Sequence, residues 1–212
     1  MTRFPLLSRI RFRDAGTLLG LVLISLVFAV QSDVFLTQPN LINILQQSAI
    51  NACIALGMTL VIISGGIDLS VGPVAALSAV LGAAMLVAGV PVPLAIAGAL
   101  ATGVVCGFVN GALIAWGGLQ PFIVTLGGLS LYRALALIDT GGQPIFGLPD
   151  GFRAFTNGSL AGVPNPVVIV AVLALGAWII LNKTPLGEYF MAVGGAAYLV
   201  SKAIKTAKVV GF

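Results

Sequence analysis

The chain has 212 residues, of which 59% are hydrophobic and 8% are charged, and its mean hydropathy is +1.14. This composition leaves too little polar surface to enclose a soluble globule, so it predicts an integral membrane protein. A net charge of +4 points to membrane orientation and anionic headgroups, and not to nucleic acid, because no basic stripe with interleaved aromatic residues occurs. With no histidine, two cysteines and six carboxylates, neither a Ser-His triad nor a His-based zinc site can be assembled. We therefore expect no enzyme active site, cofactor or metal.

Six apolar runs are long enough to cross a hydrocarbon core, which takes about 20 helical residues. They lack the in-out alternation of barrel strands, so helices are predicted. The fold class that follows is all-α: a polytopic helical bundle forming a single transmembrane domain over 1–212. The predicted spans are 15–30, 41–63, 70–89, 93–116, 121–138 and 166–181.

The basic residues gather at the two ends of the chain. Arg3, Arg9, Arg11 and Arg13 precede the first span, and Lys183, Lys202, Lys205 and Lys208 follow the sixth. Because cytoplasmic flanks carry the excess of Lys and Arg, both termini are predicted to be cytoplasmic. The first span could instead be a secretory signal, but Ala29–Gln31 is a poor cleavage site and further spans follow, so a retained anchor is the prediction.

Four amide side chains lie on one face of the second span, over its outer half: Asn43, Gln46, Gln47 and Asn51. A polar stripe in a membrane helix faces protein or water. Two interpretations stay open: hydrogen bonding between helices, and a lining for the path of a hydroxyl-rich solute.

Asp68 is the only charged side chain between Val34 and Tyr132. An ionised carboxylate near mid-bilayer costs about 2.5–3.5 kcal/mol even on lenient scales, so it should face water, a partner group or a helix end. The run Ser64–Gly72 predicts that one helix breaks at the glycines and another begins at Asp68 or Ser70. Asp68 is thus interpreted as an N-cap, with a direct contact to solute or a partner subunit as the alternative.

Gly103, Gly107 and Gly111 repeat every four residues in the fourth span and predict a packing seam for another helix. That helix belongs to this chain or to a second subunit. Arg133, near the outer end of the fifth span, is expected to snorkel to the interface, with a place in the solute pathway as the alternative. The Gly- and Pro-rich segment 139–166 is predicted to be a long external loop on which a soluble partner could dock.

Several motifs resemble the permease subunits of bacterial ABC importers for ribose, xylose and related sugars. They are Ser64–Gly72, Gln120–Gly127, Leu131–Arg133, Gly141–Pro144, Thr184–Gly187 and Ala192–Gly195. The resemblance implies a multi-pass protein of the bacterial inner membrane that translocates a monosaccharide. It also implies cytoplasmic ATPase subunits, a periplasmic sugar-binding protein and a second permease copy or paralogue as partners. Contact with membrane lipids follows from the predicted spans.

By position, 187–205 resembles the cytoplasmic loop that contacts the ATPase in this family. The resemblance makes Gly187, Glu188, Gly194, Gly195, Lys202 and Lys205 candidate coupling residues. From the residues alone, Lys202, Lys205 and Lys208 share one face of a basic amphipathic helix. No G-x-x-x-x-G-K-[ST] loop occurs in the chain, so ATP hydrolysis is expected on a separate subunit.

Family members continue through further transmembrane helices, so we expect this chain to lack the C-terminal helices of the family. Two other functions stay open on the sequence. One is an ion-coupled secondary transporter in which Asp68 binds a proton or cation. The other is an inactive, truncated permease.

Overall fold

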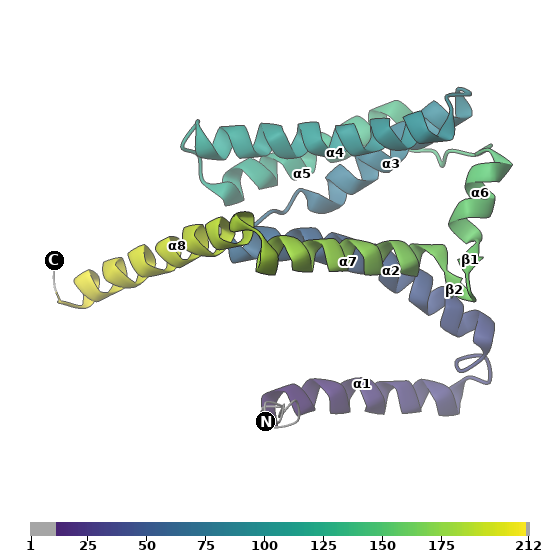
Figure 1. Cartoon of the computed structure of the whole chain (residues 1–212), viewed down its shortest axis with the longest axis horizontal. Helices are drawn as coiled ribbons and strands as arrows, with labels where there is room; N and C mark the ends of the chain where they lie inside the picture. Colours follow the sequence, from purple (N-terminus) through teal and green to yellow (C-terminus); the bar gives the residue numbers. More distant parts are fainter. Residues whose placement is uncertain (1–11, 211–212) are drawn as a thin grey trace. The chain divides into compact units, whose positions relative to one another are not determined.

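A computed structural model describes the backbone of residues 12–210 (Figure 1). Each of the six predicted spans coincides with a helix: α1 (Phe12–Gln31), α2 (Gln38–Ile63), α3 (Val71–Val87), α4 (Val92–Ala115), α5 (Pro121–Thr140) and α7 (Asn165–Lys183). By length and composition α2, α4, α5 and α7 can cross a membrane, and Leu18–Gln31 and Val71–Val87 are shorter apolar helices. The helical membrane class is thus confirmed.

The number of spans and the side on which each terminus lies stay predictions. Arg3, Arg9 and Arg11 lie outside the described residues. Arg13 belongs to α1, but its side chain is also outside the described part. The single-domain assignment likewise stays a prediction.

The chain divides into two compact units, residues 1–47 and 48–212, and α2 begins in the first and ends in the second. Within the first unit, a short turn joins α1 to α2. The Phe28 and Phe35 rings stack across this turn with their centroids 5.6 Å apart. The Asn40 amide donates a hydrogen bond of 2.8 Å to the Phe35 carbonyl oxygen. These contacts fix the start of α2 against the end of α1.

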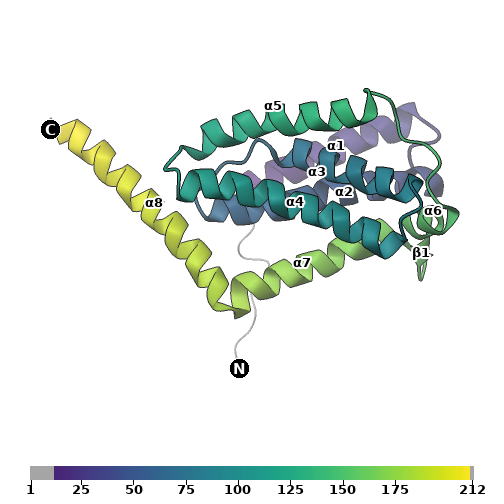
Figure 2. The same cartoon turned by 90° about the horizontal axis from the view of Figure 1, so that it is seen from above.

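The core of the second unit lies where α3 packs against α4 and α5 (Figure 2). Leu77 of α3, Cys106 of α4, and Tyr132 and Ala136 of α5 form its buried cluster. Small residues allow the close approach of α3 and α4: a Cβ added at Gly82 would lie 3.0 Å from the Ala99 Cβ. Close backbone approach through small residues is the usual basis of helix association in membranes.

The segment after α5, predicted as a loop, contains two further elements. Helix α6 (Asp150–Asn157) is short and amphipathic. Strands β1 (Ser159–Leu160) and β2 (Val163–Pro164) have two residues each and form an antiparallel hairpin. Ser159 pairs with Pro164 and Leu160 with Val163. The segment is therefore only partly the loop that was predicted, because two turns of helix are too short to show a clear periodicity in the sequence. The hairpin is too small to change the fold class.

Helix α8 (Pro185–Val210) corrects a second expectation. The family resemblance implied a loop over 187–205, whereas the backbone there is one continuous helix that meets α7 at a sharp corner (Figure 2). Gly187 is buried at this corner, where an added Cβ would overlap the carbonyl group of Leu181. The predicted helical character of the 199–208 stretch is confirmed.

Candidate functional site at the interrupted helix

The end of α2 is fixed by local glycine chemistry. The amide of Gly65 donates to the carbonyl of Ile62 and that of Gly66 to the carbonyl of Val61, each at 3.0 Å. Gly65 has φ +80°, a left-handed conformation that glycine adopts without steric cost. This pair of bonds is the Schellman arrangement, in which the residues after the helix satisfy its last carbonyl groups. The glycines of the motif therefore end α2, as predicted.

The next helix, α3, begins at Val71 with Ser70 as its N-cap residue, one of the two predicted starting points. Asp68 precedes the cap by two residues. Its Oδ1 accepts hydrogen bonds from the Ser70 amide and the Ser70 hydroxyl, each 2.7 Å long. Asp68 therefore organises the turn before α3 without being the N-cap residue itself. We call residues 64–70 the break segment.

A chain of buried hydrogen bonds connects the break segment to α4 and α5. The Asn110 amide of α4 donates to Ser70 Oγ at 2.8 Å, and the Tyr132 hydroxyl of α5 donates to Asn110 Oδ1 at 2.9 Å. Since Ser70 in turn donates to Asp68, every donor in the series points toward the carboxylate. Ser70, Asn110 and Tyr132 are 0%, 6% and 5% exposed. We call these four residues the Asp68 network.

Thr125 adds a second tie between α5 and the break segment. Its hydroxyl lies 3.3 Å from the Ile67 carbonyl oxygen and donates to the Pro121 carbonyl at 2.8 Å. Thr125 is 2% exposed. Side chains of neighbouring helices thus hold the break segment at Ile67 and at Ser70, on either side of Asp68, which fixes the place of Asp68.

A cavity of about 440 Å³ opens beside Asp68, and we call it the Asp68 cavity. Asp68, Asn110, Thr125 and Ser64 supply its polar groups, together with the backbone of Gly65 and Gly66. Apolar and glycine positions complete the wall: Val61, Ile67, Gly107, Gly111, Ile114, Pro121 and Val193. An apolar pocket with a few convergent polar groups is the usual form of a small-molecule site. Carboxylate, amide and hydroxyl groups of this kind bind the hydroxyl groups of a polar solute.

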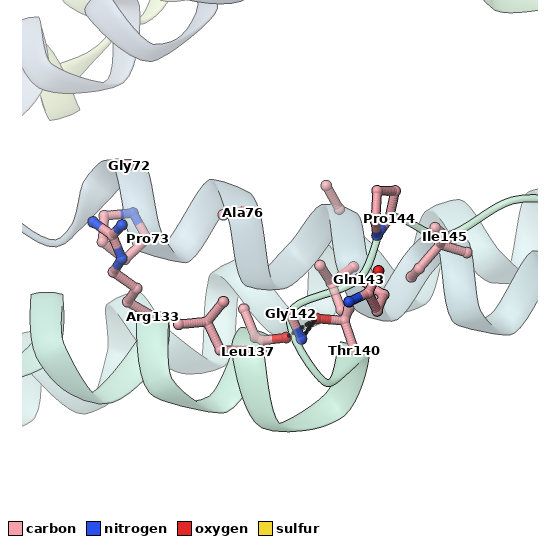
Figure 3. Close-up of a pocket in the computed structure, with 14 residues that line it drawn as sticks. Gly72, Pro73, Ala76, Arg133, Leu137, Thr140, Gly142, Gln143, Pro144 and Ile145 are labelled. Atoms are coloured by element: carbon pink, nitrogen blue, oxygen red, sulfur yellow. Dashed lines mark hydrogen bonds between the residues drawn. The ribbon is translucent and has the colours of Figure 1, made fainter.

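A second cavity, of about 660 Å³, lies between α3 and α5 (Figure 3). Arg133 lines it and extends toward Gly72 and Pro73 at the start of α3, while Thr140 and Gln143 line its other end. The Gly142 amide donates to Thr140 Oγ1 at 3.1 Å and shapes the turn that follows α5. The guanidinium therefore lines a cavity within the chain. Snorkelling of Arg133 and its alternative place in the solute pathway both stay predictions.

The amide face of α2 is divided between the two units: Asn43, Gln46 and Gln47 belong to the first and Asn51 to the second. Asn43, Gln47 and Asn51 are exposed and Gln46 is half-buried. Asn51 lies about three turns, or about 18 Å, before the end of α2. A lining role for the four amides in the solute pathway stays a prediction.

The three glycines of the predicted seam have different surroundings. A Cβ added at Gly103 would lie 3.5 Å from Ser78 Oγ of α3, so this position packs within the chain. Gly107 and Gly111 meet no described atom within 4 Å, and both line the Asp68 cavity. The seam as a whole stays a prediction.

The candidate coupling residues also differ in their surroundings. Gly194 lies against the end of α2, where an added Cβ would overlap the Ile63 carbonyl oxygen. Gly195 has open space around it, and Glu188 is exposed. The side chains of Lys202 and Lys205 lie outside the described residues. A coupling role for these six positions stays a prediction.

Sequence reasoning missed Ser70, Asn110, Thr125 and Tyr132 as members of the site. Asn110 and Tyr132 carried a usable signal, since a buried amide and a buried phenol in apolar spans need partners. Among the described residues, no group of three His, Cys, Asp or Glu side chains could hold a metal ion.

Gly128 sits at the centre of the Asp68 network and offers a direct test of its packing. A Cβ there would lie 3.0 Å from Tyr132 Cε2 and 3.3 Å from both Asn110 Oδ1 and Ser70 Cβ. We expect Gly128→Ala to destabilise the protein by about 1–3 kcal/mol, the usual cost of overpacking. Gly127→Ala is the matched control, because nothing lies within 4 Å of its added Cβ and alanine favours a helix by up to about 1 kcal/mol.

Denaturant unfolding in detergent, followed by circular dichroism, measures both Gly→Ala effects. Equal stability of the two variants would contradict the tight packing around Gly128.

These features define a class of protein: a polytopic helical membrane protein with a polar site at an interrupted helix. Sequence comparison identifies the family. The sequence profile described as branched-chain amino acid transport system / permease component matches residues 40–204. The chain belongs to this permease family. It is a multi-pass protein of the bacterial inner membrane.

Three relatives illustrate the similarity. The chain is 42% identical over 182 residues to the ribose import permease protein RbsC of Bacillus subtilis (strain 168), covering 85% of this chain and 56% of the relative. It is 35% identical over 182 residues to the D-allose transport system permease protein AlsC of Escherichia coli (strain K12), covering 85% and 56%. It is 44% identical over 154 residues to the galactofuranose transporter permease protein YtfT of the same strain, covering 72% and 45%.

The chain therefore spans about half the length of the curated relatives it matches. These relatives are named as transport permeases and not as enzymes. No solved structure matches the chain.

Proposed function

We propose that this chain is the membrane-spanning permease component of an ABC importer that carries a monosaccharide of the ribose or xylose type into the bacterial cell. The observation that carries the proposal is the family match over residues 40–204, which contains every residue lining the Asp68 cavity. The family description names amino acids, whereas the three relatives are named for sugars. A sugar is therefore the proposed solute.

The chemistry of the Asp68 cavity supports a hydroxyl-rich solute. Asp68 uses Oδ1 for two hydrogen bonds to Ser70, and its carboxylate has acceptor capacity beyond them. Backbone groups at Gly65 and Gly66 and the Ser64 hydroxyl lie in the same wall. Sugar hydroxyl groups act as donors and acceptors, so this mixture suits them better than it suits an aliphatic amino acid side chain.

The interrupted helix also suits a transport cycle. Discontinuous helices in transporters place backbone groups and helix ends beside the solute, where a small shift of one half-helix changes access. In this chain α2 and α3 are joined by the break segment and are held to α4 and α5 through the Asp68 network. We propose that access to the cavity changes when this segment moves.

The partners belong to the same proposal. ATP hydrolysis takes place on separate cytoplasmic subunits, since no phosphate-binding loop occurs in the sequence. A periplasmic sugar-binding protein delivers the solute, and a second permease copy or paralogue completes the pathway. The large apolar side chains exposed on α4 and α7, such as Val104, Leu100 and Val172, suit contact with lipid or with such a partner.

The energy source distinguishes this proposal from an ion-coupled transporter. In cells that contain all subunits of the importer, uptake of labelled ribose or xylose is expected to stop on ATP depletion. It is expected to continue, at least initially, when a protonophore collapses only the proton gradient. Unlabelled pentose should compete with uptake and unlabelled leucine should not. Immediate loss of uptake with the protonophore alone would reject the ABC proposal and favour ion coupling at Asp68.

A further inference from the structure

Helix α8 comes very close to the end of α2 at Gly194. Gly194 lies so close to the Ile63 carbonyl group that an added Cβ would overlap the Ile63 oxygen, and it would lie 3.4 Å from the Gly65 nitrogen. Ile63 belongs to the last turn of α2, whose carbonyl groups have no partner within their own helix. Only a residue without a side chain permits this approach of α8 to the end of α2.

The same contact adjoins the Asp68 cavity. Val193, the residue before Gly194, lines that cavity together with Ser64 and Asp68. The break segment begins at the residue that follows Ile63, and its Gly65 has a conformation that an L side chain rarely adopts. A displacement of α8 at Gly194 would therefore act directly on the segment that carries Asp68.

We propose that Gly194 is a positioning residue that fixes the break segment and, through it, the Asp68 carboxylate. The contact makes the place of α8 and the shape of the Asp68 cavity interdependent. The inference rests on the proposed function at one point: it takes α8 to be the helix that a cytoplasmic ATPase subunit moves. The contact and its effect on the break segment can be tested without transport.

Two adjacent glycines provide a matched pair for the first test. Gly194→Ala introduces a Cβ against the Ile63 carbonyl, whereas Gly195→Ala introduces one into space with no described atom within 4 Å. The full chain carries Cys53→Ser, which removes an exposed thiol, and Cys106 is left in place because it is buried. The reporter is the maleimide labelling rate of Ile67→Cys, a break-segment position that is 54% exposed.

We expect Gly194→Ala to change the labelling rate at position 67 by about fivefold or more. The added Cβ overpacks the contact, which costs about 1 kcal/mol or more. A change of that size in the free energy between two conformations of the break segment changes their ratio about fivefold. Gly195→Ala should leave the rate unchanged. A second reporter, Phe146→Cys, lies in the segment after α5 and should label at the same rate in both variants. Equal effects of the two alanines on position 67, or an equal change at position 146, would overturn the positioning role.

Cross-linking tests the contact even if Gly194→Ala fails to accumulate. In the same background, Ser64→Cys with Val193→Cys should form a disulfide on mild oxidation, because both positions line the Asp68 cavity. Ser64→Cys with Met191→Cys is the control, since Met191 lies about 200° away around α8 from Val193. No preference for the first pair would overturn the proposal. A preferred cross-link in a chain that shows no sugar uptake would leave the proposal intact and remove only the proposed function.

Discussion

Asp68→Asn is expected to abolish most transport while leaving the amount of folded protein in the membrane unchanged. The asparagine carbonyl oxygen can accept the same hydrogen bonds from the Ser70 amide and hydroxyl that Asp68 Oδ1 accepts at 2.7 Å. The turn before α3 is therefore kept and only the negative charge is lost. Because a hydrogen bond to a charged group is worth about 1.5–3 kcal/mol, uptake at limiting sugar should fall by about tenfold or more.

The two interpretations of Asp68 separate in this experiment. If Asp68 only organises the turn, Asp68→Asn transports normally and Asp68→Ala loses stability by about 0.5–2 kcal/mol, as for the loss of a cap. Asp139→Asn is the control, since it neutralises an exposed carboxylate near the end of α5. Initial uptake rates, normalised to the permease content of the membrane, decide the result. Normal uptake by Asp68→Asn would contradict a role for the charge in the pathway.

Asn110→Leu is expected to cause the largest loss of stability among single changes in the site. It removes the 2.8 Å bond to Ser70 and the 2.9 Å bond from Tyr132, in surroundings where all three residues are buried. Each bond between membrane helices contributes about 0.6 kcal/mol on average, and an unpaired buried polar group costs about 1–3 kcal/mol. Ser70 and Tyr132 keep their bonds to Asp68 and to the Cys106 carbonyl, but the buried Ser70 Oγ loses the donor that Asn110 supplied. We therefore expect a loss of about 2 kcal/mol or more.

Two comparisons isolate the Asp68 network in this measurement. Tyr132→Phe removes one member and should cost less than Asn110→Leu, and the double variant should cost less than the sum because the two residues share a bond. Asn182→Leu is the control, since Asn182 is exposed and, within the described part of the chain, its side chain bonds only to the Trp178 carbonyl of its own helix. Unfolding by denaturant in detergent measures all four variants. Equal effects of Asn110→Leu and Asn182→Leu would show that the Asp68 network adds nothing to stability.

Local chemistry made the interrupted helix predictable. Gly65 and Gly66 end α2 through bonds to carbonyl groups three and five residues earlier, and Ser70 starts α3. Such bonds join near neighbours, so the sequence contains all the information they need. Asp68 was found for the same reason, because a lone carboxylate in an apolar stretch requires a polar environment.

The partners of Asp68 were not predictable in this way. Asn110 bonds to a residue 40 positions earlier, and Tyr132 bonds to Asn110 across 22 positions. Which side chains meet depends on how α4 and α5 rotate about their axes. These helices are apolar on most of their surface, so the hydrophobic pattern does not indicate a buried face. The contact of Gly194 with Ile63 escaped prediction for a related reason, since the segment 187–205 was expected to be a loop.

The sequence by itself determined the membrane-embedded helical class, the positions of the apolar helices and the interruption between α2 and α3. Each follows from interactions along the chain: backbone groups in lipid must bond within their own helix, and glycines and serines act within a few residues. Only the tertiary structure decided that Ser70, Asn110 and Tyr132 form one hydrogen-bonded series leading to Asp68, and that Gly194 touches the end of α2. Contacts between apolar helices depend on close packing and on helix rotation, which hydropathy does not encode.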